Sequence, residues 1–196
     1  QVAELKARVR SAVRQHRLIT MLSQRARIDG MTGLWNRAYF DERLAQEVQE
    51  ARRHGGSVAL VMADLDHFKS VNDTWGHPFG DRVIEVFAEI LATRRDHDIA
   101  CRYGGEEFAV IMPRATRKDA AIVAERWRAQ LESRHWDRAP NQRITASFGV
   151  ADLDTAQDGS PLAIVKAADE ALYASKEGGR NRVTQAPQHG HWKLSA

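Results

Sequence analysis

Four carboxylates stand where the sequence predicts the ends of two apolar strands. Asp64 ends the apolar run over residues 57–63, Asp66 follows two residues later, and Glu106 and Glu107 come directly after a Gly-Gly pair. Acids at the ends of buried strands are costly to desolvate unless a cation or hydrogen bonds compensate. If the two strands are neighbours, these acids would repel one another and favour Mg²⁺ or Mn²⁺, because hard cations prefer carboxylate oxygens and retain phosphate ligands. The alternative is that the acids are solvated loop residues.

Two cations form a second candidate group. Lys176 and Arg180 stand four residues apart at a predicted helix end, with Gly178 and Gly179 between them. Cations at that end interact favourably with the helix dipole, which would be a sufficient structural reason for them. They also suit the oxygens of a triphosphate, because arginine binds through a bidentate fork and lysine as a point charge. Carboxylates that bind a metal, together with cations that bind phosphate, indicate nucleotidyl transfer.

Helices and strands must position these residues. The hydrophobic periodicity and the capping residues predict helices over residues 36–53, 81–94, 118–132 and 161–177. Short apolar runs predict strands over residues 57–63, 99–103, 106–112, 143–151 and 182–184, the last at an edge. A short helix or turn is expected through Val71, followed by a loop over residues 72–80.

The Gly104-Gly105 pair predicts a hairpin with a primed turn, which requires positive φ. The order of elements implies an α/β fold, in which helices flank a mixed five-stranded sheet.

Composition excludes several classes of protein. The 196 residues are 43% hydrophobic and 28% charged, which is close to the soluble average and argues against disorder or a fibrous repeat. The longest uncharged apolar run, residues 58–63, is far shorter than the roughly 20 residues of a membrane helix. The single cysteine, Cys101, fits a reducing compartment, and no signal peptide is visible. We therefore expect a cytoplasmic location and no membrane segment.

The net charge of +3 is unevenly distributed. Residues 1–28 hold seven Lys or Arg and one acid, or +6, which leaves −3 for the remainder. This distribution argues against a nucleic-acid partner, because the basic residues are confined to the N-terminal arm. Apolar positions from Val2 to Ile19 follow coiled-coil spacing, so the arm is either a signalling coiled coil or an amphipathic helix on its own domain. We expect a domain over residues 29–186 and a loose tail over residues 187–196.

Several segments in order along the chain resemble the GGDEF family, the diguanylate cyclases. The central segment, Arg102-Tyr-Gly-Gly-Glu-Glu-Phe108, is similar to the GGEEF variant of the family signature. The other matching segments cover residues 29–37, 64–69, 72–73, 76–81, 145–151 and 171–181. Trp75 stands where the family usually has Phe, and Pro78 is a second departure; neither is a predicted ligand. The resemblance implies a fold similar to the polymerase palm and the class III nucleotide cyclases, and the condensation of two GTP into cyclic di-GMP with release of two pyrophosphates.

The resemblance also implies roles for individual residues. Asp64 and Glu107 would bind the divalent metal (Mg²⁺ or Mn²⁺), with the Leu65 carbonyl as a further ligand. Glu106 would be either a metal ligand or the general base that takes the proton of the GTP 3′-hydroxyl. The remaining positions implied in GTP binding are Asn72 and Asp81 for guanine, Lys69, Lys176 and Arg180 for phosphate, Phe68 and Leu34 for the base pocket, and Gly104 and Gly105 for close approach to the backbone. Read alone, Asn72 suits an Asx turn and Asp81 a helix N-cap.

Regulation and assembly follow from the same resemblance. Arg95 and Asp98 fit the family's RxxD product-inhibition site, and Arg126 matches a second inhibitory arginine. Each domain would hold one GTP, so the reaction implies a homodimer, and an upstream sensor or receiver domain is expected to precede this fragment. The alternative is a catalytically silent cyclic di-GMP receptor or dimerisation module.

Overall fold

The computed structural model describes residues 27–93, 96–156 and 158–188. The helices are α2 (Arg37–His54), α3 (Phe68–Trp75), α4 (His77–Ala92), α5 (Arg117–Glu132), α6 (Pro161–Glu177) and the 3₁₀ turn η1 (Leu153–Thr155). The strands are β1 (Trp35–Asn36), β2 (Val58–Leu65), β3 (Ile99–Arg102), β4 (Glu107–Pro113), β5 (Ala146–Asp152) and β6 (Val183–Gln185). The predicted helical arm and most of the predicted tail lie outside the described residues.

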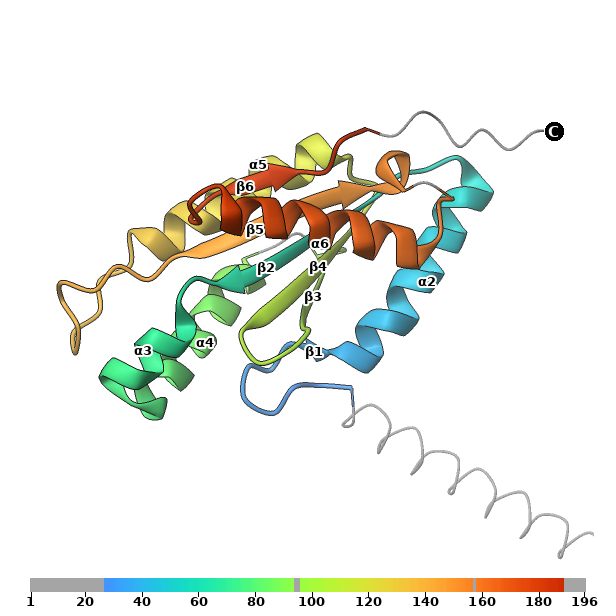
Figure 1. Ribbon diagram of the computed structural model, residues 1–196. Helices are drawn as coiled ribbons and strands as arrows, with labels where there is room; N and C mark the ends of the chain where they lie inside the picture. The colour runs from blue at the N-terminus through green and yellow to red at the C-terminus, as the bar shows by residue number, and fades with distance from the viewer. Residues whose placement is uncertain (1–26, 94–95, 157, 189–196) are drawn as a thin grey trace, which may run out of the picture.

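The strands form one mixed sheet in the order β1-β3-β4-β2-β5-β6 (Figure 1). The central strand β2 is antiparallel to both β4 and β5, and the edge pairs β1–β3 and β5–β6 are parallel. The mixed sheet with flanking helices confirms the predicted fold class. It has six strands rather than five, because β1 is only two residues long and too short to give a periodic signal.

Both faces of β2 are buried, because alternate residues enter two separate hydrophobic layers. Ala59 and Val61 pack into the layer under α3, α4 and α5, whereas Leu60 and Met62 pack into the layer under α2 and α6. Figure 1 shows α6 across the near face of the sheet and α5 behind it. The prediction of a strand buried on both faces is confirmed.

Residues 72–80 are helical rather than a loop. Helix α3 continues through Asn72 to Trp75, Gly76 alone separates the two helices, and α4 begins at His77. Gly76 has φ 80°, a conformation that favours glycine, and Pro78 lies in the first turn of α4, where its missing N–H costs no hydrogen bond. Turn-forming residues in this stretch therefore mark a helix junction, and the predicted loop is wrong.

The predicted hairpin is confirmed, but its turn is different. Strands β3 and β4 pair up to Arg102 and Phe108, and the Tyr103 amide donates to the Glu107 carbonyl at 2.8 Å. Neither Gly104 nor Gly105 has positive φ, so the turn is not of the primed type. The longer turn leaves Glu106 outside the regular part of β4.

Helix α6 packs unusually close to the sheet at Gly149. A Cβ atom at this position would lie 2.1 Å from the Ala168 carbonyl oxygen and 2.2 Å from the Leu172 amide nitrogen. The strand therefore needs a glycine there, because any side chain would push the helix backbone away.

No helix among the described residues is both long enough and apolar enough to cross a membrane.

Candidate active site

Asp64 lies at the end of β2, between two strands that supply its neighbours. The register pairs it with Glu107 on β4 and with Ser147 on β5. Directly opposite residues of an antiparallel pair have their side chains on the same face of the sheet, so the Asp64 and Glu107 carboxylates are neighbours. The sequence prediction that these two acids meet at a strand end agrees with this register.

Lys176 joins the same group from the last turn of α6. Its Nζ lies 2.8 Å from Asp64 Oδ2, and the Asp64 side chain is only 12% exposed. Ser160 is the N-cap of the helix: its hydroxyl accepts a hydrogen bond from the Ala163 amide, and Pro161 occupies the first helical position. The cap and the close packing at Gly149 fix the helix, and so they place Lys176 over the end of β2.

The electrostatics of Asp64 reflect this crowding. Burial raises its pKa, and the neighbouring carboxylates of Glu107 and Asp66 act in the same direction, while Lys176 opposes them. Two carboxylate charges in a partly buried site are unfavourable, and the ammonium group of Lys176 offsets only part of their repulsion. The site therefore favours additional positive charge.

The turn that carries the two glutamates is held by Arg102. Its Nε and Nη2 donate to the Gly105 carbonyl at 3.1 and 2.9 Å, and Nη1 contacts both oxygens of Asp29 at 3.3 Å. The backbone carbonyl of Glu106 accepts the Leu65 amide at 3.3 Å, which ties the turn to β2. Glu106 is half-buried, and because it precedes β4, strand alternation does not force its side chain away from that of Glu107.

The two glycines of the turn differ in their surroundings. A Cβ atom on Gly104 would lie 2.6 Å from Glu107 Oε2, so the glutamate carboxylate occupies the space beside that backbone. Gly105 has nothing within 4 Å and is open to a ligand. Of the two predicted positions of close approach, Gly105 is therefore the one with free space beside it.

The predicted guanine-binding residues gather at the α3–α4 junction. A Cβ atom on Gly80 would lie 1.9 Å from Asn72 Oδ1 and 3.2 Å from Phe68 Cζ, so the Asn72 side chain packs directly against the Gly80 backbone. Asp81 follows Gly80 and is exposed. It is the fifth residue of α4, whose N-cap is Gly76, so the alternative N-cap role for Asp81 is wrong. Leu34 and Phe68 are both buried in the layer beneath these helices.

Asp66 lies close enough to Asp64 to act on its pKa, but its own oxygens are already engaged in hydrogen bonds within the chain. It is buried, and both of its oxygens accept hydrogen bonds from other parts of the chain: from the hydroxyls of Thr145 and Ser147 and from the Asn181 amide. Sequence reasoning missed this role. The matched segments over residues 145–151 and 171–181 contained the partners, but nothing in the sequence paired them with Asp66.

The other predicted phosphate-binding residues are not bonded to the Asp64–Lys176 pair among the described residues. Lys69 is exposed on α3, and Arg180 is half-exposed in the loop after α6. Within residues 27–93, 96–156 and 158–188, no hydrogen bond or ion pair connects either side chain, or that of Glu106, to Asp64.

The predicted inhibitory site is only partly described. Arg95 lies outside the described residues, and Asp98 is buried just before β3. Arg126, on α5, donates through Nη2 to the Thr93 carbonyl at 2.9 Å. This contact places Arg126 beside Thr93, which precedes Arg95 by two positions in the sequence.

The donor set fits a divalent cation. Asp64 and Glu107 supply hard carboxylate oxygens on adjacent strands, and their mutual repulsion favours a cation between them. Among the described residues, no group of three or more His, Cys, Asp or Glu side chains is arranged to bind a metal, so the remaining ligands would be backbone, water or substrate oxygens. Magnesium characteristically binds through one or two carboxylates and substrate phosphates.

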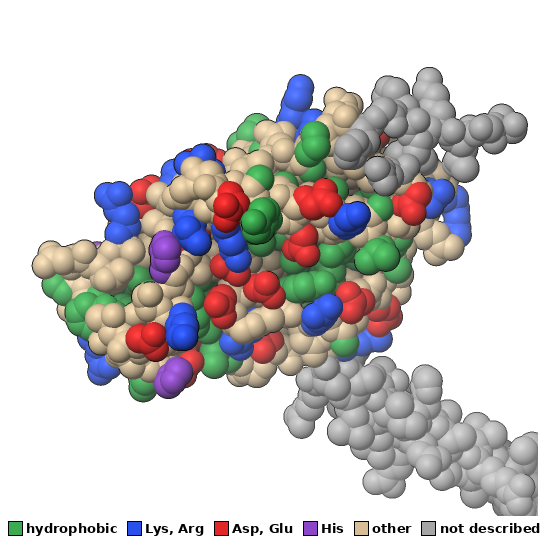
Figure 2. All heavy atoms as spheres, viewed as in Figure 1, with side chains coloured by type: hydrophobic (Ala, Val, Ile, Leu, Met, Phe, Trp, Pro, Cys, Tyr) green, Lys and Arg blue, Asp and Glu red, His purple; other side chains and the backbone are tan. Residues whose placement is uncertain are grey.

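The fold and the site define an α/β domain with two acids on its central strands, a lysine in the last turn of its last helix and an arginine in the loop that follows. Figure 2 shows acidic and basic side chains side by side on the face covered by α6, rather than one broad basic surface. The family model described as "Diguanylate cyclase, GGDEF domain" matches residues 26–182. The chain belongs to this family.

Two curated proteins and a solved structure show the extent of the similarity. The chain is 40% identical over 192 residues to the response regulator PleD of Caulobacter vibrioides, covering 92% of this chain and 42% of PleD. It is 38% identical over 159 residues to the probable diguanylate cyclase DgcC of Escherichia coli, covering 81% of this chain and 43% of DgcC. The crystal structure of the coiled coil and GGDEF domain of DgcB from Caulobacter crescentus in complex with c-di-GMP matches with a TM-score of 0.82 and 38% identity, over 94% of this chain and 98% of that one. The chain thus spans less than half the length of the two curated relatives.

Proposed function

We propose that this chain is the catalytic domain of a diguanylate cyclase, which condenses two GTP into cyclic di-GMP and releases two pyrophosphates. The observation that carries the proposal is the pairing of Asp64 with Glu107 across adjacent strands, with Lys176 at 2.8 Å. Family membership and the names of the relatives support the same activity.

In this proposal Asp64, Glu107 and the Leu65 carbonyl would hold Mg²⁺ or Mn²⁺. When bound, the cation would supply positive charge that offsets the phosphate charge and lowers the pKa of the 3′-hydroxyl. Glu106 is either a further ligand or the base that accepts the hydroxyl proton. Its position in the turn, outside regular β4, supports a role beside Glu107.

GTP is held at both of its ends. Lys176, Arg180 and Lys69 bind the triphosphate, with Gly105 leaving space beside the turn. At the other end, Asn72 and Asp81 recognise guanine, with Phe68 and Leu34 beneath the base. A carboxylate accepts from guanine N1–H and N2–H₂, and adenine has no N1–H donor, so Asp81 favours GTP over ATP.

Each domain binds one GTP, so turnover requires two domains face to face in a homodimer. The coiled-coil arm would transmit the state of an upstream sensor or receiver domain to the spacing or rotation of the two domains. Product binds at Arg95, Asp98 and Arg126 and inhibits the enzyme. The hydrogen bond from Arg126 to Thr93 supports this assignment.

Synthesis of cyclic di-GMP from GTP and Mg²⁺ by the purified chain tests the proposal. Glu106→Gln should abolish product formation, whereas Glu89→Gln, which changes an exposed acid on α4, should leave it unchanged. Binding of cyclic di-GMP without synthesis would instead support the receptor alternative. Product formation unaffected by Glu106→Gln would refute the proposed chemistry.

A further inference from the structure

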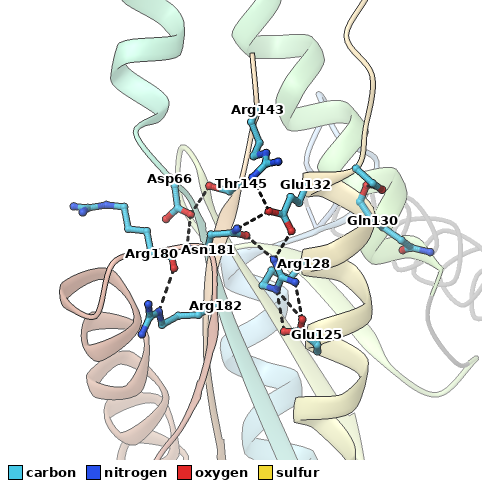
Figure 3. Close-up of polar contacts among 11 residues, drawn as sticks. Asp66, Glu125, Arg128, Gln130, Glu132, Arg143, Thr145, Arg180, Asn181 and Arg182 are labelled. Atoms are coloured by element: carbon cyan, nitrogen blue, oxygen red, sulfur yellow. Dashed lines mark hydrogen bonds and ion pairs between the residues drawn. The ribbon is translucent and has the colours of Figure 1, made fainter. Parts of the chain in front are cut away.

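Asp66 is a buried carboxylate with no role in the proposed chemistry. It is 6% exposed, and its Oδ1 accepts the Ser147 hydroxyl at 2.7 Å. Its Oδ2 accepts the Thr145 hydroxyl at 2.8 Å and the backbone amide of Asn181 at 3.0 Å (Figure 3). All three donors come from β5, the segment just before it, or the loop after α6. Asp66 thus fastens that loop to the end of β2.

The fastened loop has an unusual backbone. Arg180 and Asn181 are consecutive non-glycine residues with φ 62° and 46°, and Gly179 before them has φ 108°. Left-handed backbone is unfavourable for residues with a Cβ atom, and asparagine tolerates it better than arginine. Such a conformation persists only where the surrounding contacts determine it.

The side chain of Asn181 supplies further contacts of this kind. Its Oδ1 accepts from Arg128 Nη1 at 2.8 Å, and its Nδ2 donates to Glu132 Oε1 at 2.9 Å. Arg128 also binds Glu132 and Glu125 on its own helix, which fixes its guanidinium. Asn181 is therefore held through its backbone by Asp66 and through its side chain by α5.

Arg180, by contrast, has its backbone fixed and its side chain unengaged. Its amide donates to the Ser175 carbonyl, and its carbonyl accepts from Arg182 Nε. Its guanidinium has no hydrogen-bond or ion-pair partner in the part of the chain that the structure describes. In Figure 3 the Arg180 side chain extends away from the network around Asn181.

We infer that Asp66 and Asn181 are positioning residues, which hold Arg180 in a left-handed turn so that its guanidinium is presented to the GTP phosphates. The inference rests on the proposed function, because that function assigns phosphate binding to Arg180. An arginine whose backbone is preorganised loses less conformational entropy when it binds substrate. Asp66 and Asn181 would therefore increase the affinity for GTP without contacting the nucleotide.

Asn181→Ala tests the inference, because it removes the side-chain contacts and disfavours the left-handed backbone. We expect the KM and the Kd for GTP to rise about tenfold, with a much smaller change in kcat. Asn181→Gly permits the backbone conformation but lacks the side chain, so it should recover part of the affinity. In an Arg180→Ala background, Asn181→Ala should have almost no further effect, because the group that it positions is gone.

A matched pair of arginine variants controls for general effects. Arg128→Gln and Arg43→Gln each remove an arginine that pairs with an acid on its own helix, but only Arg128 contacts Asn181. Only Arg128→Gln should weaken GTP binding. Equal losses from Asn181→Ala with and without Arg180 would overturn the inference. A wild-type chain that binds no GTP would refute both the proposed function and this inference. A wild-type chain that binds GTP, but no more tightly than Asn181→Ala does, would refute the positioning role alone.

Discussion

Substitution of Gly149 by alanine should loosen α6 and disturb the site at its end. The added Cβ atom would lie 2.1 Å from the Ala168 carbonyl oxygen, 2.2 Å from the Leu172 amide nitrogen and 2.8 Å from the Leu172 Cα. All three atoms belong to the helix backbone, so no side-chain rotation can relieve the overlap. The helix must move away from β5 by about an ångström to restore ordinary contact distances.

The expected cost is at the upper end of the range for overpacked cores, about 3 kcal/mol. For a domain of this size, that loss lowers Tm by roughly 6–12 °C. Lys176 is on the same helix, so its 2.8 Å contact with Asp64 should lengthen as well. We therefore expect lower cyclase activity from the folded fraction, in addition to the lower stability.

Thermal and urea unfolding measure the stability, and initial rates of product formation measure the activity. Gly56→Ala is the matched control, because its Cβ atom would meet only Ala51, at 3.7 Å or more, and lies outside the site. It should leave Tm nearly unchanged. A Gly149→Ala variant with the stability and the GTP KM of the wild type would contradict the argument, since it would show that α6 accommodates the methyl group without moving.

Three further predictions concern other parts of the domain. Gly80→Ala would place a Cβ atom 1.9 Å from Asn72 Oδ1, so the displaced amide should raise the GTP KM about tenfold; an unchanged KM would argue against guanine recognition by Asn72. Burial of Asp29 opposes its ionisation, but hydrogen bonds from Thr32 and the charge of Arg102 outweigh that effect and lower its pKa below 3.8. Unfolding measured against pH should therefore show Asp29→Asn less stable than wild type above about pH 4, and the difference should vanish as the pH falls through the lowered pKa; a difference that persists in acid would contradict this. Arg126→Ala should raise the cyclic di-GMP concentration needed for inhibition about tenfold in a product-inhibition assay, and unchanged inhibition would reject the assignment.

Much of the fold could be predicted because the local signals agree with the tertiary structure. The bounds of α6 match the prediction, since Ser160 and Pro161 mark its start and the Gly-Gly pair marks its end. The prediction failed over residues 72–80, where Gly76, Pro78 and Gly80 suggest a loop. There the burial of Val71 and Phe79 in one hydrophobic layer stabilises two helices on either side of a single glycine, and tertiary packing outweighs local propensity.

Only those parts of the candidate site that depend on local sequence signals could be predicted. Asp64 and Glu107 each follow from a strand end, which is a local feature of the sequence. The proposed roles of Asp66 and Asn181 depend on a contact between residues 115 positions apart, and no local sequence pattern predicts such a contact. Likewise, the hairpin itself was evident from Gly104 and Gly105, but the type of turn was not, because it depends on the bonds that Arg102 and Leu65 make to the turn.

The contact between Asp66 and Asn181 also bears on when the site can form during synthesis. Every residue of β2 is synthesised long before the loop after α6. More than half of the domain must therefore be made between Asp66 and Asn181, whose amide is the last of its three hydrogen-bond donors in the sequence. Contacts of such long range are slow to form, because closing a long segment of chain costs entropy before the contact repays it. A chain truncated directly after Arg180 would contain Asp64, Glu107 and Lys176, but it would lack Asn181 and its contacts with Asp66 and α5. Under the proposed function, the full affinity for GTP would therefore come last, once Asn181 has made these contacts.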